Sequence, residues 1–169
     1  MPGTFFSIDV PLGASSNDAS GQDVVVLDDF MFTEPLPFES QSRLVNISTR
    51  GYVGTGDAIM VGGFVVEGVE PKTILVRGID PGIAAFVSGA LVDPTLDIVD
   101  SAGNVIALND NWGNSLLVEH VSIAVGAFPF SPDSSDAATV VVLNAGAYTV
   151  RVSGVGGSTG IALVEAYDY

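Results

Sequence analysis

The sequence predicts an all-β fold: a single-domain β-sandwich, jelly-roll-like in its string of short strands, with an extended N-terminal arm. Apolar and polar residues alternate over short segments, which is the pattern of half-buried strands. Turn signals rich in Gly, Asn and Asp separate these segments, and almost no stretch has a helical period. With 169 residues, 47% of them hydrophobic, and no cysteine, the chain can bury one core without disulfides.

The N-terminal arm is predicted for residues 1–12, where apolar side chains recur at every second position. Residues 13–22 are small and polar, which is typical of a flexible linker. The sandwich domain is predicted for residues 23–169, beginning with a strand in DVVVLDDFMF. The apolar face of the arm consists of Phe6, Ile8, Val10 and Leu12.

The remainder of the chain is predicted to be a series of strands joined by tight turns. DSAG at 100–103 has Asp at the first and Gly at the last position of a type I turn. NAG at 144–146 and GVGGSTG at 154–160 are further turn signals, and residues 81–91 are the one stretch predicted to contain helical turns. Strands are predicted near 43–50, 57–67, 72–78, 94–100, 104–109, 117–125, 137–143, 146–153 and 160–168.

The charge of the chain excludes several classes of partner. Twenty acidic residues stand against five basic ones, for a formal net charge of −15. Nucleic acids and anionic membranes both require clustered Lys and Arg, so neither is an expected partner. No apolar run approaches the roughly 18 residues of a membrane helix, and the first residues lack the pattern of a signal peptide. An acidic surface is compatible with cation binding.

A cluster of acidic and amide side chains follows the predicted strand at 104–109. Calcium binds six to eight oxygens from carboxylates, amides and carbonyls, so Asp110 could supply a charged ligand and its neighbours neutral ones. Asn and Asp are also common in turns because their side chains bond the local backbone. A calcium site and a turn without a metal are therefore both open interpretations of this cluster, and the turn is favoured. The candidate calcium ligands are Asn109, Asp110, Asn111 and Asn114.

No set of residues predicts catalysis, and we expect that the chain is not an enzyme. His120 is the single histidine, it falls in a predicted strand, and no nucleophile motif accompanies it. The carboxylate pairs Asp28–Asp29 and Asp133–Asp136 are interpreted as solvated surface, because glycosidases need two carboxyl groups converging in a cleft. Trp112 is interpreted as a packing residue rather than a sugar-binding platform.

Three segments carry a resemblance to known proteins: LVNISTRGYVGTGDAIMVGGFVVEG, PKTILVRGID and VDPTLDIVDSAGNVIALNDNWG. Together they resemble a β-rich module of large secreted proteins of Verrucomicrobia and Planctomycetes. The second half is also similar to the bacterial pre-peptidase C-terminal domain. The shared elements are the hairpin from Asp100 to Gly103, the turn at Asn109–Asp110 and the strand from Gly146 to Val152. The resemblance covers about residues 43–168. It implies an extracellular, non-catalytic module, and calcium near the turn in several members.

Three functions are compatible with these observations. The first is a structural subunit of an extracellular bacterial filament or surface layer, in which the arm adds a strand to a neighbouring copy of the chain. The second is a calcium-dependent accessory or adhesion module that binds carbohydrate or cell wall. The third is a virion surface protein. The first depends on the arm, whose apolar face would be exposed unless it pairs as an edge strand with its own domain or with a neighbouring copy, and both alternatives stay open.

Overall fold

The computed structural model describes residues 44–169, so the predicted arm at 1–12, the linker at 13–22 and the strand in 23–32 lie outside the described residues. The described part contains eight strands, one α-helix and three short 3₁₀ turns. The strands are β1 (Asn46–Val53), β2 (Met60–Val66), β3 (Lys72–Ile79), β4 (Pro94–Asp100), β5 (Val105–Asn109), β6 (Ala137–Leu143), β7 (Gly146–Gly154) and β8 (Gly160–Asp168). The helix is α1 (Leu116–Val125), and the 3₁₀ turns are Gly56–Ala58, Pro81–Ile83 and Val155–Gly157.

The strands form two antiparallel four-stranded sheets with the orders β1-β8-β3-β6 and β2-β7-β4-β5. Strand β4 pairs with β5, β3 with β6, β2 with β7, and β1 with β8. The chain therefore resembles one long hairpin, closed at its tip by the β4–β5 turn and wrapped into two layers. This is the topology of a jelly roll, and the predicted all-β sandwich is confirmed.

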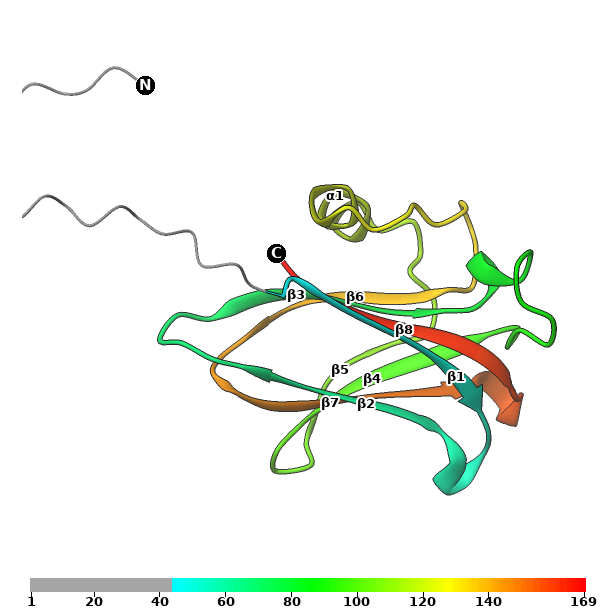
Figure 1. Ribbon diagram of the computed structural model, residues 1–169, viewed down its shortest axis with the longest axis horizontal. Helices are drawn as coiled ribbons and strands as arrows, with labels where there is room; N and C mark the ends of the chain where they lie inside the picture. The colour runs from blue at the N-terminus through cyan, green and yellow to red at the C-terminus, as the bar shows by residue number, and fades with distance from the viewer. Residues whose placement is uncertain (1–43) are drawn as a thin grey trace, which may run out of the picture. The chain divides into compact units, whose positions relative to one another are not determined.

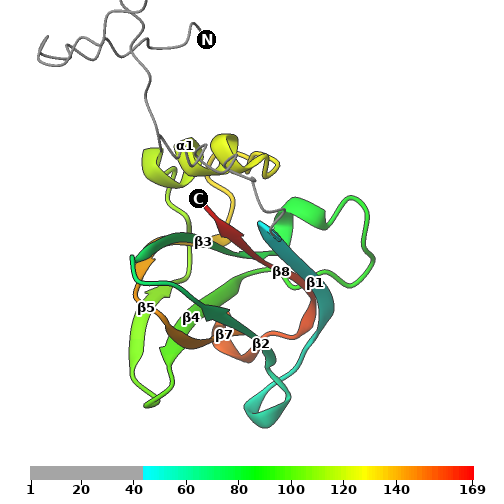
Figure 2. The same cartoon turned by 60° about the vertical axis from the view of Figure 1, so that its left-hand side comes forward.

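Alternation along each strand builds the core between the two layers (Figure 1). Inward-facing residues come from β4 and β7 in one sheet and from β3 and β8 in the other. They include Val76 and Ala162 on one side and Ile98 and Val150 on the other, all of them fully or almost fully buried. Outside this core, α1 lies on the face of the β1-β8-β3-β6 sheet that points away from the second sheet (Figures 1 and 2).

The predicted turn at 100–103 is present and is held as expected. The N–H of Gly103 donates to the Asp100 carbonyl over 3.0 Å. The Asp100 Oδ1 accepts from the N–H groups of Ala102 and Asn104 at 2.9 and 2.8 Å. Hydrogen bonds from the Asn104 side chain and from these N–H groups lower the pKa of Asp100. Gly103 has φ = +87°, which favours glycine.

The prediction of a strand at 117–125 was wrong, because this segment forms α1. The segment is rich in Val and Ile, which favour strands, but both of its ends carry helix signals. Ser115 is the N-cap, and its Oγ accepts from the Val118 N–H at 3.4 Å. Gly126 ends the helix with φ = +74°. The buried residues Val118, Val121 and Ser122 recur at helical spacing and face the sheet.

The first two strands also begin later than predicted. Strand β1 starts at Asn46 rather than near 43. Strand β2 starts at Met60 rather than near 57, because Gly56–Ala58 forms a 3₁₀ turn.

Within residues 44–169, no helix has the length and apolar character that crossing a membrane would require.

Candidate functional site

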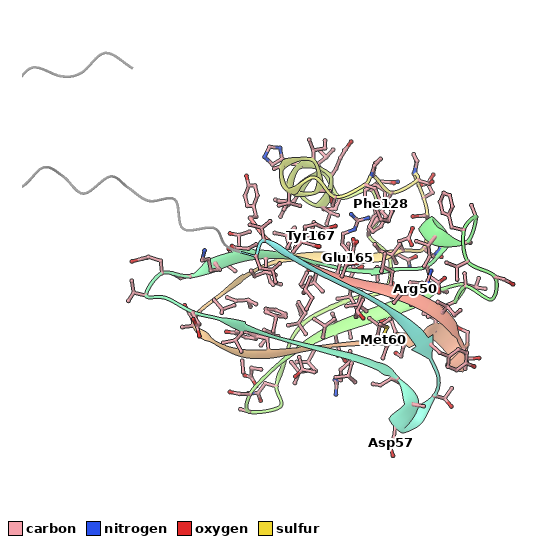
Figure 3. The ribbon with its side chains drawn as sticks, in the orientation of Figure 1. Arg50, Asp57, Met60, Phe128, Glu165 and Tyr167 are labelled. Carbon is pink, nitrogen blue, oxygen red and sulfur yellow. The ribbon has the colours of Figure 1, made fainter. Side chains whose placement is uncertain are left out.

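Within residues 44–169, the side of the sandwich between β1 and β2 is open. Each of these strands lies at the edge of its sheet and has one neighbour among the described strands. They leave the turn at Gly56–Ala58 and separate from each other (Figures 1 and 2). Close to the turn the space between them is filled, since a Cβ on Gly51 would lie 3.4 Å from the Met60 Cε. Asp57 marks this turn, and Met60 lies next to it (Figure 3).

Away from the turn, an apolar groove of about 540 Å³ opens between the strands. The register of β1 on β8 places Ile47 beside Ala166 and Thr49 beside Val164, and both β8 residues face the core. Directly opposed residues point to the same face of a sheet, so Ile47 and Thr49 also point inward. Nevertheless Ile47 is 51% exposed and Thr49 is exposed. The groove is lined chiefly by Leu44, Val45, Ile47, Phe64, Val66 and Ile74.

In the part of the chain that the structure describes, one edge of β1 has no strand beside it. The Asp168 N–H donates to the Val45 carbonyl at 2.9 Å, so Val45 directs its backbone groups toward β8. Backbone direction alternates along a strand, and every second residue after Val45 also points toward β8. The N–H and C=O groups of Asn46, Ser48, Arg50 and Tyr52 therefore point to the unpaired edge. An unpaired edge beside an apolar groove is a template for an additional strand.

The predicted calcium ligands lie in the loop that joins β5 to α1, and their side chains fasten this loop to other segments. The Asn109 Oδ1 accepts from the Ala138 N–H of β6 at 2.9 Å, and its Nδ2 donates to the Asn111 carbonyl at 2.9 Å. The Asn111 Nδ2 donates to the Asp110 Oδ1 at 2.8 Å. Each of these bonds is the kind expected of Asn and Asp in a turn.

Asn114 forms a second attachment, to the loop that precedes β6. Its Nδ2 donates to the Asp133 Oδ1 at 2.6 Å, and its Oδ1 accepts from the Asp133 N–H at 3.0 Å. Both residues have positive φ, +54° and +57°, which Asn and Asp tolerate better than most residues. The amide oxygens of Asn109 and Asn114 thus bond different segments, Ala138 and Asp133, rather than converging on one point.

The calcium site at these four residues stays a prediction. Within residues 44–169, no group of three or more His, Cys, Asp or Glu side chains could hold a metal ion. A site here would depend on Asp110 as its charged ligand together with amide and carbonyl oxygens, which is a donor set that calcium accepts. Asp110 is exposed and its Oδ1 accepts from Asn111.

The interpretation of Asp136 as a solvated carboxylate was wrong, because Asp136 is fully buried and joins three segments. Its Oδ1 accepts from the N–H groups of Asp80 and Gly82 at 2.8 and 3.1 Å. Its Oδ2 accepts from the Ser134 Oγ at 2.8 Å. The Ser134 Oγ in turn accepts from the Trp112 Nε1 at 3.2 Å. Sequence reasoning missed this residue, since an Asp in SPDSSD has no pattern that distinguishes it from surface.

Asp80 is the second buried carboxyl group at this end of the sandwich. Both of its oxygens are buried, and neither has a hydrogen-bond partner among the described residues. Burial, reinforced by the negative charge of Asp136, raises the pKa of Asp80 from 3.8 to about 8. At neutral pH this group is therefore mostly protonated and uncharged, which lowers the cost of its burial.

Arg77 is buried beneath the segment that follows α1. Its Cζ lies 4.4 and 4.1 Å from the ring centroids of Phe128 and Phe130, and its Nε lies 3.6 Å from the Glu165 Oε2 (Figure 3 labels Phe128 and Glu165). Burial lowers the pKa of Arg77, and Glu165 opposes this change. Burial and then Glu165 raise the pKa of Tyr167 to about 12. None of the three guanidinium nitrogens has a hydrogen-bond partner among the described residues, so the two rings and Glu165 are what offset the burial of this cation.

The remaining predicted residues do not form a catalytic arrangement among residues 44–169. His120 is exposed on α1 rather than on a strand, and its ring lies 6.4 Å from that of Tyr169, edge to face. Glu119, its neighbour in the sequence, is also exposed on this helix. Trp112 is only 8% exposed and packs beside Phe130 with ring centroids 5.6 Å apart, which agrees with its interpretation as a packing residue.

Comparisons with known proteins identify a structural likeness. No family model matches the chain, and no curated protein matches it. Among solved structures, the chain is similar to the crystal structure of the pre-peptidase C-terminal domain of a collagenase from Bacillus anthracis, with 13% sequence identity and a TM-score of 0.45. The likeness covers 72% of this chain and 89% of that one. A likeness of this size carries no argument about function, and the fold rests on the strand order itself. The resemblance to modules of Verrucomicrobia and Planctomycetes stays a prediction.

Proposed function

We propose that the chain is a structural subunit of an extracellular bacterial assembly, in which the N-terminal arm of one copy adds a strand to the next copy. The acceptor is the groove between β1 and β2. One observation carries the proposal: Ile47 and Thr49 point toward the core from β1 and are nevertheless exposed, beside an unpaired strand edge. A sandwich exposes inward-facing residues where a covering strand is absent.

The arm has the composition that this groove requires. Its alternating apolar side chains would enter the space between the sheets, while its backbone would bond the free edge. Burying a side chain of this kind contributes about 1.5–3 kcal/mol before the cost of ordering the arm is subtracted. These side chains are Phe6, Ile8, Val10 and Leu12.

A contact of this kind joins copies head to tail. The arm and the groove are different surfaces, so each subunit can donate to one neighbour and accept from another. Repetition of the contact gives a filament unless the rotation closes a ring. The net charge of −15 would keep the surfaces of such an assembly from associating nonspecifically. The proposal assigns no catalytic step.

The arm can be tested by replacing its four apolar residues with serine, which keeps its length. The full chain should form assemblies at about 100 µM, measured by light scattering and negative-stain microscopy, and the serine variant should be monomeric with an unchanged melting temperature. Deletion of residues 1–12 should have the same effect. A serine or deletion variant that still forms long assemblies would overturn the proposal, as would a full chain that stays monomeric.

Calcium has a separate place in this proposal, as a ligand that would stiffen the loop at Asn109–Asn114. Binding of an ion to the folded protein alone raises its apparent stability by mass action. The melting temperature should therefore be higher in about 5 mM calcium than in chelator, and Asp110→Asn should remove the difference. A melting temperature that is equal in both solutions would show that this loop is a turn without a metal.

A further inference from the structure

We infer that the donated arm pairs with the edge of β1 rather than with that of β2, and that Asp9 of the arm lies against Arg50 of the accepting copy. This inference rests on the proposed function and specifies its partner surface. It is carried by a different observation, the distribution of basic residues on the described part of the chain.

The described residues contain four Lys or Arg side chains, and three of them have a carboxylate partner. Lys72 lies 3.1 Å from Asp168, Arg151 donates to both oxygens of Asp97 at 2.7 and 2.6 Å, and Arg77 lies near Glu165. The fourth, Arg50, is exposed and has no carboxylate within 4 Å among residues 44–169. In a chain of twenty acidic residues, an unpaired arginine marks a surface on which an acidic group from elsewhere is favoured.

Arg50 is at the free edge of β1 and faces outward. It alternates with the inward-facing Thr49 and Gly51, and its backbone groups point to the unpaired edge. Figure 3 labels it on this side of the sandwich. A strand added here would place one of its outward-facing side chains directly beside the Arg50 guanidinium.

The arm has a carboxylate in the matching position. When its apolar residues point into the groove, the residues between them must point outward, because side chains alternate along a strand. Asp9 lies between Ile8 and Val10, at the centre of the arm. It is the only charged residue among residues 2–12. The orientation of the arm that points its apolar side chains into the groove is therefore also the one that points Asp9 outward, toward Arg50.

The edge of β2 lacks a corresponding group. Its outward-facing positions are Val61, Gly63 and Val65, which are exposed and apolar or without a side chain. An arm paired with β2 would place Asp9 beside these valines, and the cation on this face, Arg151 opposite Val61 on β7, is already bonded to both oxygens of Asp97. The ionic contact therefore distinguishes two edges that the groove by itself leaves equivalent.

Charge exchange tests the contact. Asp9→Arg and Arg50→Asp should each weaken association about 3- to 10-fold at low salt, because an opposite-charge pair across strands becomes a like-charge pair. The double exchange should restore most of the affinity. Because Arg50 is exposed, its variants should have the same melting temperature as the wild type. A control at the other edge, Val61→Asp, should have less effect on association than Arg50→Asp.

Cysteine crosslinking tests the position directly, since the chain contains no cysteine of its own. Directly opposed residues on neighbouring strands are close enough for a disulfide. The variant with Asp9→Cys and Arg50→Cys should form disulfide-linked dimers and longer ladders on oxidation, and the pair Asp9→Cys with Val61→Cys should not. A mixture of the two single-cysteine variants should give dimers only.

The outcomes separate this inference from the proposed function. If the serine variant of the arm abolishes assembly but the charge exchange has no effect and the Asp9–Arg50 pair does not crosslink, then the arm docks elsewhere and this inference is wrong. If the Asp9–Arg50 crosslink forms within a single chain, the arm covers its own domain, and both the exchange between copies and this inference are wrong.

Discussion

The two lateral sides of the sandwich differ in how the inward-facing residues of their edge strands are covered. At the side of β5 and β6, the β6 residues Ala137 and Leu143 are buried and Val141 is half-buried. At the side of β1 and β2, the inward-facing Ile47 and Thr49 are exposed. The strands also differ in composition, since β5 (VIALN) and β6 (AATVVVL) are largely apolar whereas β1 (NISTRGYV) is mostly polar.

Polar side chains explain part of it. The Asn109 side chain connects the end of β5 to the N–H of Ala138 in β6, and the buried Asp136 attaches the start of β6 to the segment after β3. No equivalent bridge between β1 and β2 is present in the described residues beyond the turn that joins them. Among the described residues, the closed side is therefore fastened by buried hydrogen bonds and the open side is not.

The largest effect on stability is expected from Leu143→Ala on the closed side. Leu143 is 4% exposed and belongs to the core between the sheets. Removing its side chain should lower the free energy of unfolding by about 2–5 kcal/mol, because apolar burial is lost and a cavity remains. Urea unfolding measures the change. A loss below about 1 kcal/mol would show that the closed side is packed no better than the open one.

A smaller effect is expected from Asn109→Ala, which removes the bridge between β5 and β6. The half-buried N–H of Ala138 would lose its acceptor, and the free energy of unfolding should fall by about 1–3 kcal/mol. Asn109→Asp keeps an acceptor oxygen and should be less destabilising, which makes it the matched control. Equal losses in the two variants, measured by chemical unfolding, would contradict the role given to the Ala138 bond.

The pH dependence of stability should report on Asp80, near the same end of the closed side. The folded protein keeps a proton on Asp80 up to about pH 8, whereas the unfolded chain releases it near pH 4. The stabilisation is therefore complete below pH 4 and is lost as pH rises toward 8. Asp80→Asn should gain stability relative to the wild type between pH 5 and 8, with a constant difference above pH 9. Thermal melts across this range measure the difference, and the exposed Asp57→Asn is the control.

The smallest effect is expected from Ile47→Ala on the open side, in protein dilute enough to be monomeric. Half of the Ile47 side chain is already exposed, so the free energy of unfolding should fall by less than about 1 kcal/mol. The same substitution should weaken assembly, because the donated arm would lose a contact. If the dilute monomer loses as much stability from Ile47→Ala as from Leu143→Ala, the groove is already covered by the protein's own chain.

Local sequence determined the strands, and it did so through alternation and turn residues that act over a few positions. Six of the eight strands lie within one residue of their predicted ranges at each end, β1 and β2 begin three residues later than predicted, and the hairpin at Asp100–Gly103 is present with its expected bonds. The helix α1 was missed because its β-branched composition outweighed two correct local signals, the Ser115 cap and the Gly126 stop. Both signals are present in the sequence and would have predicted a helix between Ser115 and Gly126.

Tertiary structure alone decided which polar residues are buried and which edge is open. Asp136 and Asp80 are 56 positions apart, and their carboxyl groups become buried neighbours only when the end of β3 packs beside the start of β6. Ile47 has the apolar character of a core residue, and its exposure depends on the strand order, which places β1 and β2 at the edges of their sheets. Alternation specifies the face of a strand, but only the assembled sheets specify what covers that face.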